Sequence, residues 1–232
     1  MELLKAENLT KRFLKKTVLD DLNIVMEEGR IYGLVGPNGS GKTTLMRIVA
    51  GLLQPTSGSI AIDGKRAGTK TKGIVSFAPT TNHLPKWMRI KNSLDYYRDF
   101  YEDFDINRAQ EMLGFMGLKQ EQKIDNLSTG YAGRLKLALA LSRNARLYVL
   151  DEPLNGLDPI SRDKVLEAIL KASGEKNSLL LSSHMIRDME AVLDEIIFLD
   201  TGKVVLSGNA DQLRMEKGLS IEELYREVYG DA

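Results

Sequence analysis

The sequence predicts an α/β fold with a small antiparallel β subdomain and an inserted α-helical subdomain. Strand and helix patterns alternate in the second half of the chain, which is typical of a layered α/β core. A glycine-rich loop at 36–44 lies between an apolar strand and a helix. Strand signals are missing from about 86 to 145. We therefore expect a single domain over 1–232, with its core and β subdomain at 1–85 and 146–232 and the helical subdomain between them.

The composition excludes several classes of protein. The chain has 232 residues, with 32 Lys and Arg against 32 Asp and Glu. Such a balance lacks the broad basic surface that holds nucleic acid, so we expect no nucleic-acid partner. The absence of cysteine excludes disulfides and thiolate metal sites and fits a cytoplasmic protein. No apolar run reaches the roughly 20 residues that cross a bilayer, so a membrane role requires a partner.

The N-terminal third has the pattern of short strands joined by glycine turns. In VMEEGRIYGLVG, a turn at Glu28–Gly29 precedes a buried strand. In QPTSGSIAIDGK, Gly58 and Asp63–Gly64 bracket a short alternating strand, which predicts a small antiparallel sheet. We interpret the basic loop at 65–72 as a solvated hairpin turn rather than a nucleic-acid contact.

Helical patterns fill the middle of the chain and then alternate with strands. The middle segment predicts helices at 93–104, 107–117 and 130–143. The later elements are a strand at 147–150, a helix at 159–172, a strand at 178–182, a helix at 185–193 and a strand at 195–199. The apolar run LYVL at 147–150 is typical of a parallel strand buried on both faces. Near the C-terminus, Ser220 and Glu223 form a capping-box pattern, which predicts a terminal helix packed on its own domain.

The loop GPNGSGKTT fits the phosphate-binding pattern G-x-x-x-x-G-K-T. Its glycines let the backbone turn sharply or approach a ligand closely, and its N–H groups form an anion nest at a helix N-terminus. Lys42 then reaches the outer phosphates, and the Thr43 hydroxyl is a ligand for Mg²⁺. The residues expected to bind nucleotide are Gly36, Pro37, Asn38, Gly39, Ser40, Gly41, Lys42, Thr43 and Thr44. The alternative is a bare strand-to-helix turn, which would not need the lysine and the hydroxyl together.

Two acidic residues follow the apolar strand at 147–150. Asp151 stands at the carboxyl end of that strand, where it is well placed to hold Mg²⁺ through water. Glu152 is placed to polarise the attacking water. The sequence has no guanine-reading Asn-Lys-x-Asp motif, which disfavours a GTPase.

Five motifs, in this order, resemble those of the ATP-binding cassette (ABC) family, and the match covers nearly the whole chain. They are GPNGSGKTT as the Walker A loop, LSTGY at 127–131 as a variant of the LSGGQ signature, LYVLDEP as Walker B, LNGLD at 154–158 as the D-loop, and SSHMI as the switch-histidine motif. The resemblance implies a P-loop NTPase core of the ABC ATPase type, which binds ATP and Mg²⁺ and hydrolyses the ATP.

The family resemblance also implies a dimer. In this family two ABC subunits pack head to tail, so that ATP on the phosphate loop of one is capped by the signature of the other. Ser128 and Gly130 are thus expected to present a hydroxyl, N–H groups and a helix N-terminus to the γ-phosphate across the interface. ATP holds such a dimer closed, and hydrolysis releases it. The second subunit is either an identical copy or a paralogue.

Two ring side chains receive roles from the same resemblance. His184 corresponds to the switch histidine, which contacts the γ-phosphate, and we expect it to be catalytic together with Lys42 and Glu152. Phe13 aligns with the aromatic residue that stacks on adenine in similar proteins. Packing in the core is the alternative for Phe13, since every aromatic side chain has both uses.

One position departs from the family pattern. The family has a glutamine that touches Mg²⁺ about where Thr80 falls, and no glutamine lies between Thr56 and Gln110. A threonine hydroxyl can still ligate Mg²⁺, but it is shorter, so we expect altered coupling or turnover. Just downstream, Trp87 lies in the region that forms the permease groove in similar proteins; a satellite core position is the alternative.

Together these features predict an ATP-hydrolysing subunit that powers transport through a separate transmembrane permease. We expect it to be cytoplasmic and peripheral at the inner face of the cell membrane, which it touches only through the permease. Two alternatives stay open. One is a soluble ABC ATPase that moves no substrate, although such proteins usually carry two cassettes or long coiled coils, which this chain lacks. The other is a nucleotide-sensing subunit that hydrolyses ATP poorly, which Thr80 favours slightly.

Overall fold

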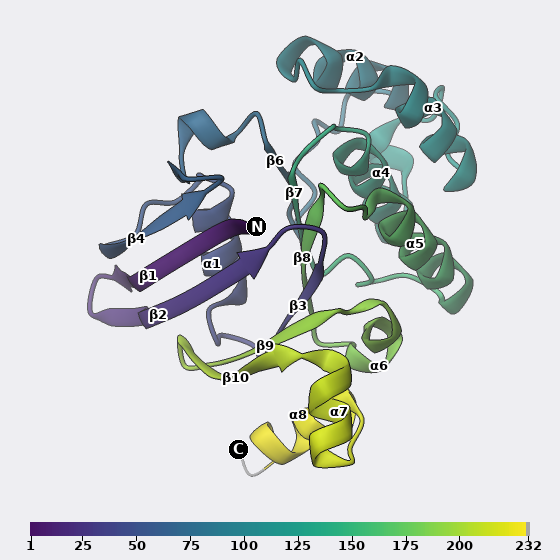
Figure 1. Cartoon of the computed structure of the whole chain (residues 1–232). Helices are drawn as coiled ribbons and strands as arrows, with labels where there is room; N and C mark the ends of the chain where they lie inside the picture. The colour runs from purple at the N-terminus through teal and green to yellow at the C-terminus, as the bar shows by residue number, and fades with distance from the viewer. Residues whose placement is uncertain (231–232) are drawn as a thin grey trace.

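Two β-sheets and the helices around them form the structure, a computed structural model that describes residues 1–230 (Figure 1). The strands are Glu2–Phe13 (β1), Lys16–Glu27 (β2), Ile31–Val35 (β3), Ser57–Ile62 (β4), Lys65–Arg66 (β5), Val75–Ala78 (β6), Leu147–Asp151 (β7), Ser178–Ser183 (β8), Glu195–Asp200 (β9) and Lys203–Asn209 (β10). The α-helices are Lys42–Val49 (α1), Ile90–Phe100 (α2), Ile106–Phe115 (α3), Thr129–Leu141 (α4), Pro159–Ala172 (α5), Ile186–Met189 (α6), Ala210–Lys217 (α7) and Ile221–Tyr229 (α8).

The larger sheet has the strand order β10-β9-β3-β8-β7-β6. Adjacent strands in it run parallel, except that β10 is antiparallel to β9. β3 and β7 are buried along their whole length, as their continuous apolar runs predict. Successive side chains of β3 alternate between two hydrophobic cores. Tyr32 and Leu34 pack with α1 and the smaller sheet, whereas Ile31 and Val35 pack with the helices on the opposite face. The larger sheet is therefore the middle layer of the molecule.

The smaller sheet has the order β2-β1-β4-β5 and is antiparallel, which confirms the expected β subdomain. α1 lies between the two sheets, and its buried side chains Leu45, Met46 and Ile48 join them (Figure 1). Gly58 lies within β4 rather than before it, and a Cβ there would meet the Asn8 carbonyl oxygen at 2.2 Å.

The basic loop differs in part from its prediction. It holds the short strand β5 and the 3₁₀ turn Thr69–Thr71, in which Thr71 is completely buried. The Thr71 hydroxyl and the Gly68 backbone exchange hydrogen bonds at 3.0 Å, which closes the turn. The four basic side chains of the loop are exposed, as expected for a solvated segment.

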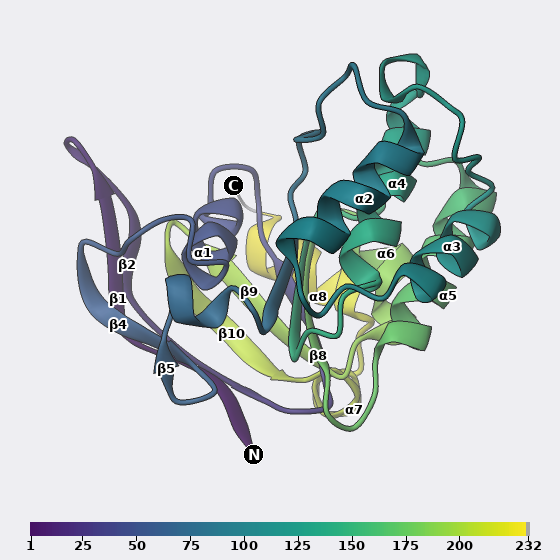
Figure 2. The ribbon, with the colours of Figure 1, turned by 90° about the horizontal axis from the view of Figure 1, so that it is seen from above.

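Three helices, α2, α3 and α4, lie between β6 and β7 in the chain and gather on the side away from the antiparallel sheet (Figure 2). α2 begins at Ile90, three residues before the prediction, because the Asn92 side chain accepts the Arg89 N–H and caps the first turn. It ends at Phe100, because the chain then turns toward Asp105, whose carboxylate caps α3. α4 begins after Ser128, which is its N-cap.

The C-terminal half contains one wrong prediction. The helix expected at 185–193 is a single turn, α6, followed by the 3₁₀ turn Glu190–Val192. The chain leaves the helical conformation at Leu193, which is extended and buried, so that β9 can begin two residues later. β10 and α7 were not predicted. α5 has the predicted bounds, and α8 is capped by Ser220 and Glu223 as expected.

Candidate functional site

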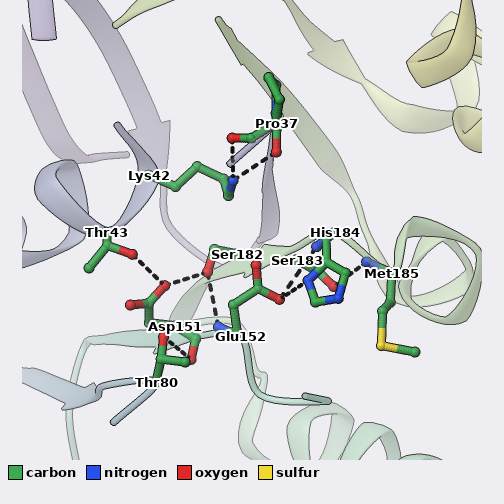
Figure 3. Close-up of polar contacts among 11 residues, drawn as sticks. Pro37, Lys42, Thr43, Thr80, Asp151, Glu152, Ser182, Ser183, His184 and Met185 are labelled. Atoms are coloured by element: carbon green, nitrogen blue, oxygen red, sulfur yellow. Dashed lines mark hydrogen bonds and ion pairs between the residues drawn. The ribbon is translucent and has the colours of Figure 1, made fainter. Parts of the chain in front are cut away.

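Three neighbouring parallel strands end at the same edge of the larger sheet, and functional residues follow each end. β3 leads into Gly36, β7 ends at Asp151, and β8 ends at Ser183 just before His184. β3, β8 and β7 are adjacent in the sheet, so their carboxyl ends meet, which is the usual place for a ligand in an α/β fold. Figure 3 shows the polar side chains that converge there.

Glycines shape the loop between β3 and α1. A Cβ on Gly36 would lie 2.1 Å from the Leu199 carbonyl oxygen, so a side chain does not fit there. Gly41, the residue before α1, has a φ of 111°, which other residues rarely adopt. These two glycines confirm that the backbone turns sharply and approaches a neighbour closely. The loop thereby leads into the N-terminus of α1, where backbone N–H groups favour an anion.

The ammonium group of Lys42 lies against this loop. Its Nζ donates hydrogen bonds to the carbonyl oxygens of Gly36 at 2.7 Å and Pro37 at 3.0 Å (Figure 3). The side chain is largely buried, and burial lowers the pKa of Lys42 from its ordinary value. The Glu152 and Asp151 carboxylates oppose that shift in pKa. A buried cation therefore faces two acids across the site.

Asp151 is the acid beside α1. Its Oδ1 accepts hydrogen bonds from Ser182 Oγ at 2.7 Å and from Thr43 Oγ1 at 3.3 Å. Its Oδ2 is buried and has no hydrogen-bond partner within residues 1–230. A buried carboxylate oxygen is costly unless an ion or water binds it, and a carboxylate beside a hydroxyl suits Mg²⁺. These residues fit the predicted metal ion.

Glu152 has an unusual backbone conformation. Its φ is 53°, in the left-handed region that residues other than glycine rarely adopt and that is enriched at functional sites. Its N–H donates to Ser182 Oγ at 3.0 Å, and its Oε2 lies 2.8 Å from Nδ1 of His184. The Glu152 side chain is 14 % exposed and that of His184 is 50 % exposed. The acid is therefore held from both ends, and the histidine stands at the mouth of the site.

Thr80, which stands where the family has a glutamine, also contacts this cluster. The Thr80 hydroxyl donates to the Asp151 backbone carbonyl at 3.3 Å (Figure 3). A cleft of about 740 Å³ is lined by Thr80, Glu152, His184 and all of the predicted loop residues except Ser40. Ser40 is 3 % exposed, and its Oγ is buried without a partner within residues 1–230.

Sequence reasoning missed five residues of the site. Ser182 joins Asp151 to Glu152; its signal was a serine at the end of a fully buried strand. The other four line the cleft and are Lys16, Val18, Asn155 and Tyr225. Tyr225 comes from α8, far away in the sequence, so its amphipathic spacing indicated only packing. Burial and then the Glu152 charge raise the pKa of Tyr225, so its phenol stays neutral.

The predicted signature residues do not reach the cleft of their own chain. Ser128 is exposed, and its Oγ accepts the Tyr131 N–H at 3.3 Å as the N-cap of α4. Gly130 lies in the first turn of the same helix, and neither residue lines the cleft. Their position at an exposed helix end is compatible with a role in a second subunit.

Phe13 and Trp87 are both exposed. Phe13 is 45 % exposed at the end of β1, with Lys11 Nζ 4.9 Å from its ring centre. Trp87 is 77 % exposed in the loop before α2. Core packing, the alternative for each of them, is therefore wrong. Adenine stacking and permease anchoring stay predictions.

Comparison with known proteins places the chain in a family. Residues 19–155 match the family described as ABC transporter. The chain is 31 % identical to the ABC transporter ATP-binding protein YtrB of Bacillus subtilis (strain 168), over 92 % of this chain and 74 % of that protein. It is 33 % identical to the lantibiotic transport ATP-binding protein SrtF of Streptococcus pyogenes, over 90 % of this chain and 92 % of that protein. It is 32 % identical to the bacitracin transport ATP-binding protein BcrA of Bacillus licheniformis, over 91 % and 71 %.

Solved structures show the same fold. An ATP binding subunit of an ABC transporter has a TM-score of 0.88 and 28 % identity, and the match covers 97 % of this chain and 98 % of that one. The dimeric post-hydrolysis state of the cassette MJ0796 bound to ADP and Pi has a TM-score of 0.81 and 24 % identity, over 89 % and 98 %. Within residues 1–230, no helix has both the length and the apolar character needed to cross a membrane. The chain belongs to the ABC transporter family and is one of its ATP-binding subunits, an α/β P-loop ATPase that powers transport.

Proposed function

We propose that this chain binds MgATP at the 36–44 loop and hydrolyses it with Glu152 as the general base. The observation that carries the proposal is the cluster of Lys42, Asp151 and Glu152 at one edge of the parallel sheet, closed on its outer side by His184. Phosphoryl transfer to water requires three kinds of group. Lys42 is a cation for the phosphates, Asp151 is a carboxylate with a buried oxygen available to a metal ion, and Glu152 is a second carboxylate at the cleft.

Binding uses the loop and the residues around it. Backbone N–H groups and Lys42 hold the β- and γ-phosphates, because the ammonium group can exchange its two carbonyl partners for phosphate oxygens. Thr43 and Asp151 hold Mg²⁺, with Thr80 beside them. When bound, the metal ion neutralises charge on the phosphates. Phe13 stacks on the adenine ring, and its exposure leaves one face free for that contact.

Hydrolysis uses the second acid. Glu152 accepts a proton from water as the water oxygen attacks the γ-phosphorus, and the bond to the bridging oxygen breaks to give ADP and phosphate. A positioned base of this kind raises the reaction rate by about 10²- to 10⁴-fold. His184 holds Oε2 of Glu152 through Nδ1. Its other ring nitrogen is then free to donate to the γ-phosphate. With Nδ1 as the donor, the remaining carboxylate oxygen of Glu152 is the one that receives the proton.

The chain works in pairs. Ser128 and Gly130 cap the nucleotide bound by a second ABC subunit, and the phosphate loop receives the same residues from that subunit. The N-terminus of α4 supplies the positive end of a helix dipole to the γ-phosphate. Residues 86–145 act as a helical subdomain within the single ATPase domain 1–232. Loss of the γ-phosphate removes the group that both subunits hold, so the pair opens.

A transmembrane permease is the third component, and the chain binds it at the inner face of the cell membrane. Trp87 is an exposed aromatic anchor beside α2, suited to a helix presented by the permease. Relatives of this chain are named for lantibiotic and bacitracin transport. Peptide antibiotics are therefore the first class of cargo to test in vesicles that hold the chain and its permease.

An ATPase assay on the purified chain tests the central step. We expect Mg²⁺-dependent phosphate release that falls by about 10²-fold or more in Glu152→Gln, with ATP binding retained. Glu167→Gln on the exposed face of α5 is the matched control and should keep full activity. Full activity in Glu152→Gln would remove this residue as the base. Negligible hydrolysis by the wild-type chain, even with its permease, would favour the nucleotide-sensing alternative.

A further inference from the structure

A lysine of α4 crosses from the helical segment to the nucleotide site. Lys136 Nζ donates hydrogen bonds to the backbone carbonyls of Pro79 at 2.8 Å and Thr80 at 2.6 Å. These residues directly follow β6, so the contact joins α4 to the loop that leads out of the parallel sheet. It spans more than 50 positions of sequence. Farther along the helix, α4 packs on β6, and Ser76 Oγ donates to the Ala140 carbonyl at 2.8 Å.

Burial makes this lysine unusual. Lys136 is only 9 % exposed, and its neighbours Leu135 and Leu137 in α4 are buried apolar residues. Burial lowers the pKa of Lys136, and the Asp151 carboxylate opposes the shift. An apolar side chain would fill the same space without the cost of desolvating a charge. Packing alone therefore does not account for the ammonium group, whereas its two short hydrogen bonds do.

The lysine borders a second cleft beside the catalytic acids. This cleft has a volume of about 270 Å³ and is lined by Thr80, Gly133, Lys136, Glu152 and Asn155, among others. The first turns of α4 form one wall, and the ends of β6 and β7 form the other. The hydrogen bonds of Lys136 cross this cleft at the N-terminal part of α4, whereas the later turns of α4 pack directly on β6.

Contacts continue from the lysine to the metal-binding acid. Lys136 holds the Thr80 carbonyl, and the Thr80 hydroxyl in turn donates to the Asp151 backbone carbonyl at 3.3 Å. At the other end of this connection lies Ser128, the N-cap of α4, about two turns before Lys136. A rigid helix therefore links the exposed N-cap serine to the backbone beside Asp151.

We propose that Lys136 is a positioning residue that fixes the Pro79–Thr80 backbone to α4, so that movement of the helical segment and the geometry around Asp151 change together. The inference rests on the proposed function, since it takes Asp151 and Thr80 to be at the nucleotide site. The Thr80 hydroxyl contacts the Asp151 backbone on its own wall of the cleft, and Lys136 reaches the Thr80 carbonyl from the opposite wall.

Distance measurements in the cysteine-free chain test this proposal. The substitutions Lys65→Cys and Lys119→Cys place one label on the β subdomain and one on the helical segment. Spin-label distances are then compared in this background for Lys136→Met and for the exposed control Lys91→Met. We expect Lys136→Met to broaden the nucleotide-free distribution and to remove most of the shift that MgATP causes. Lys91→Met should behave like the parent.

A second measurement covers the case in which Lys136→Met does not fold. In the unlabelled wild-type chain, an amine-reactive reagent followed by mass spectrometry should modify Lys136 about tenfold more slowly than Lys91, as expected for a buried, hydrogen-bonded amine. Equal reactivity would overturn the proposal, and so would unchanged distances and an unchanged MgATP response in Lys136→Met. A wild-type chain that does not bind ATP would instead count against the proposed function. The role of Lys136 would still be tested, because the nucleotide-free distances do not depend on ATP binding.

Discussion

Ser182 Oγ donates to Oδ1 of Asp151 at 2.7 Å and accepts the N–H of Glu152 at 3.0 Å, so one hydroxyl orients both acids of the site. Ser182 is completely buried near the end of β8, between β3 and β7 in the sheet. The neighbouring strand thus holds the left-handed backbone of Glu152 in place. A site that depends on this conformation should be sensitive to the loss of a single oxygen atom.

Ser182→Ala is expected to slow ATP hydrolysis strongly while leaving the chain folded. Loss of the hydroxyl leaves the Glu152 N–H unpaired, and a misplaced catalytic group costs about 10²-fold in rate. Ser178→Ala is the matched control, because Ser178 is equally buried on the same strand and donates to the Glu27 carbonyl at 3.1 Å, at the opposite end. Both variants should lose about 1 kcal/mol in free energy of unfolding. Equal ATPase rates in the two would show that Ser182 does not position the acids.

Lys42→Ala is expected to abolish nucleotide binding or to weaken it severely. Hydrogen bonds from a charged donor to phosphate are among the strongest in proteins, so we expect affinity to fall by about 10²-fold. Titration with a fluorescent ATP analogue measures the change. Lys70→Ala, an exposed lysine of the β subdomain, should bind normally. Unchanged ATP affinity in Lys42→Ala would contradict the assignment of the loop as the phosphate cradle.

Thr80→Gln is expected to raise ATPase activity in the presence of the permease. A glutamine amide is longer than the threonine hydroxyl and can reach past the Asp151 backbone, which Thr80 now contacts at 3.3 Å. One added contact of about 1.4 kcal/mol in the transition state corresponds to about tenfold in rate. Thr81→Gln, at the next and equally exposed position, is the control. No change in Thr80→Gln would mean that another residue has taken the role of the missing glutamine.

Trp87→Ala is expected to weaken permease binding without changing the ATPase rate of the isolated chain. Loss of an aromatic anchor costs about 2 kcal/mol or more, which is roughly 30-fold in affinity. Co-purification of the tagged chain with its permease from membranes measures the loss. Met215→Ala is the control, because Met215 is 83 % exposed on α7, in a different part of the molecule. If both variants were recovered equally with the permease, the permease would bind this chain at a site other than Trp87.

The sequence was most informative where local chemistry determines local structure. Apolar runs predicted β3 and β7, Asp158 and Pro159 mark the start of α5, and the glycines at 36–44 predicted a tight loop. Each of these depends on neighbouring residues alone, through burial, capping or φ. The acids of the site could be placed because carboxyl ends of parallel strands meet at one edge.

The remaining features depend on contacts between distant segments. The helix expected at 185–193 is shortened because Leu193 must enter the core before β9, which its own sequence does not indicate. Tyr225 and Lys136 sit on helices whose spacing predicts only packing, and their polar ends reach the site through tertiary structure. Ser182 resembles any buried serine until its strand is placed beside β7.

Cross-linking between two copies is the most direct test that each subunit caps the nucleotide of the other. The chain has no cysteine, so Asn38→Cys in the phosphate loop and Thr129→Cys beside Ser128 introduce the only thiols, in a Glu152→Gln background that retains ATP. We predict a disulfide between residue 38 of one copy and residue 129 of the other with MgATP, and none with ADP. A chain that holds MgATP yet stays uncross-linked, or that joins only 38 to 38, would contradict the account.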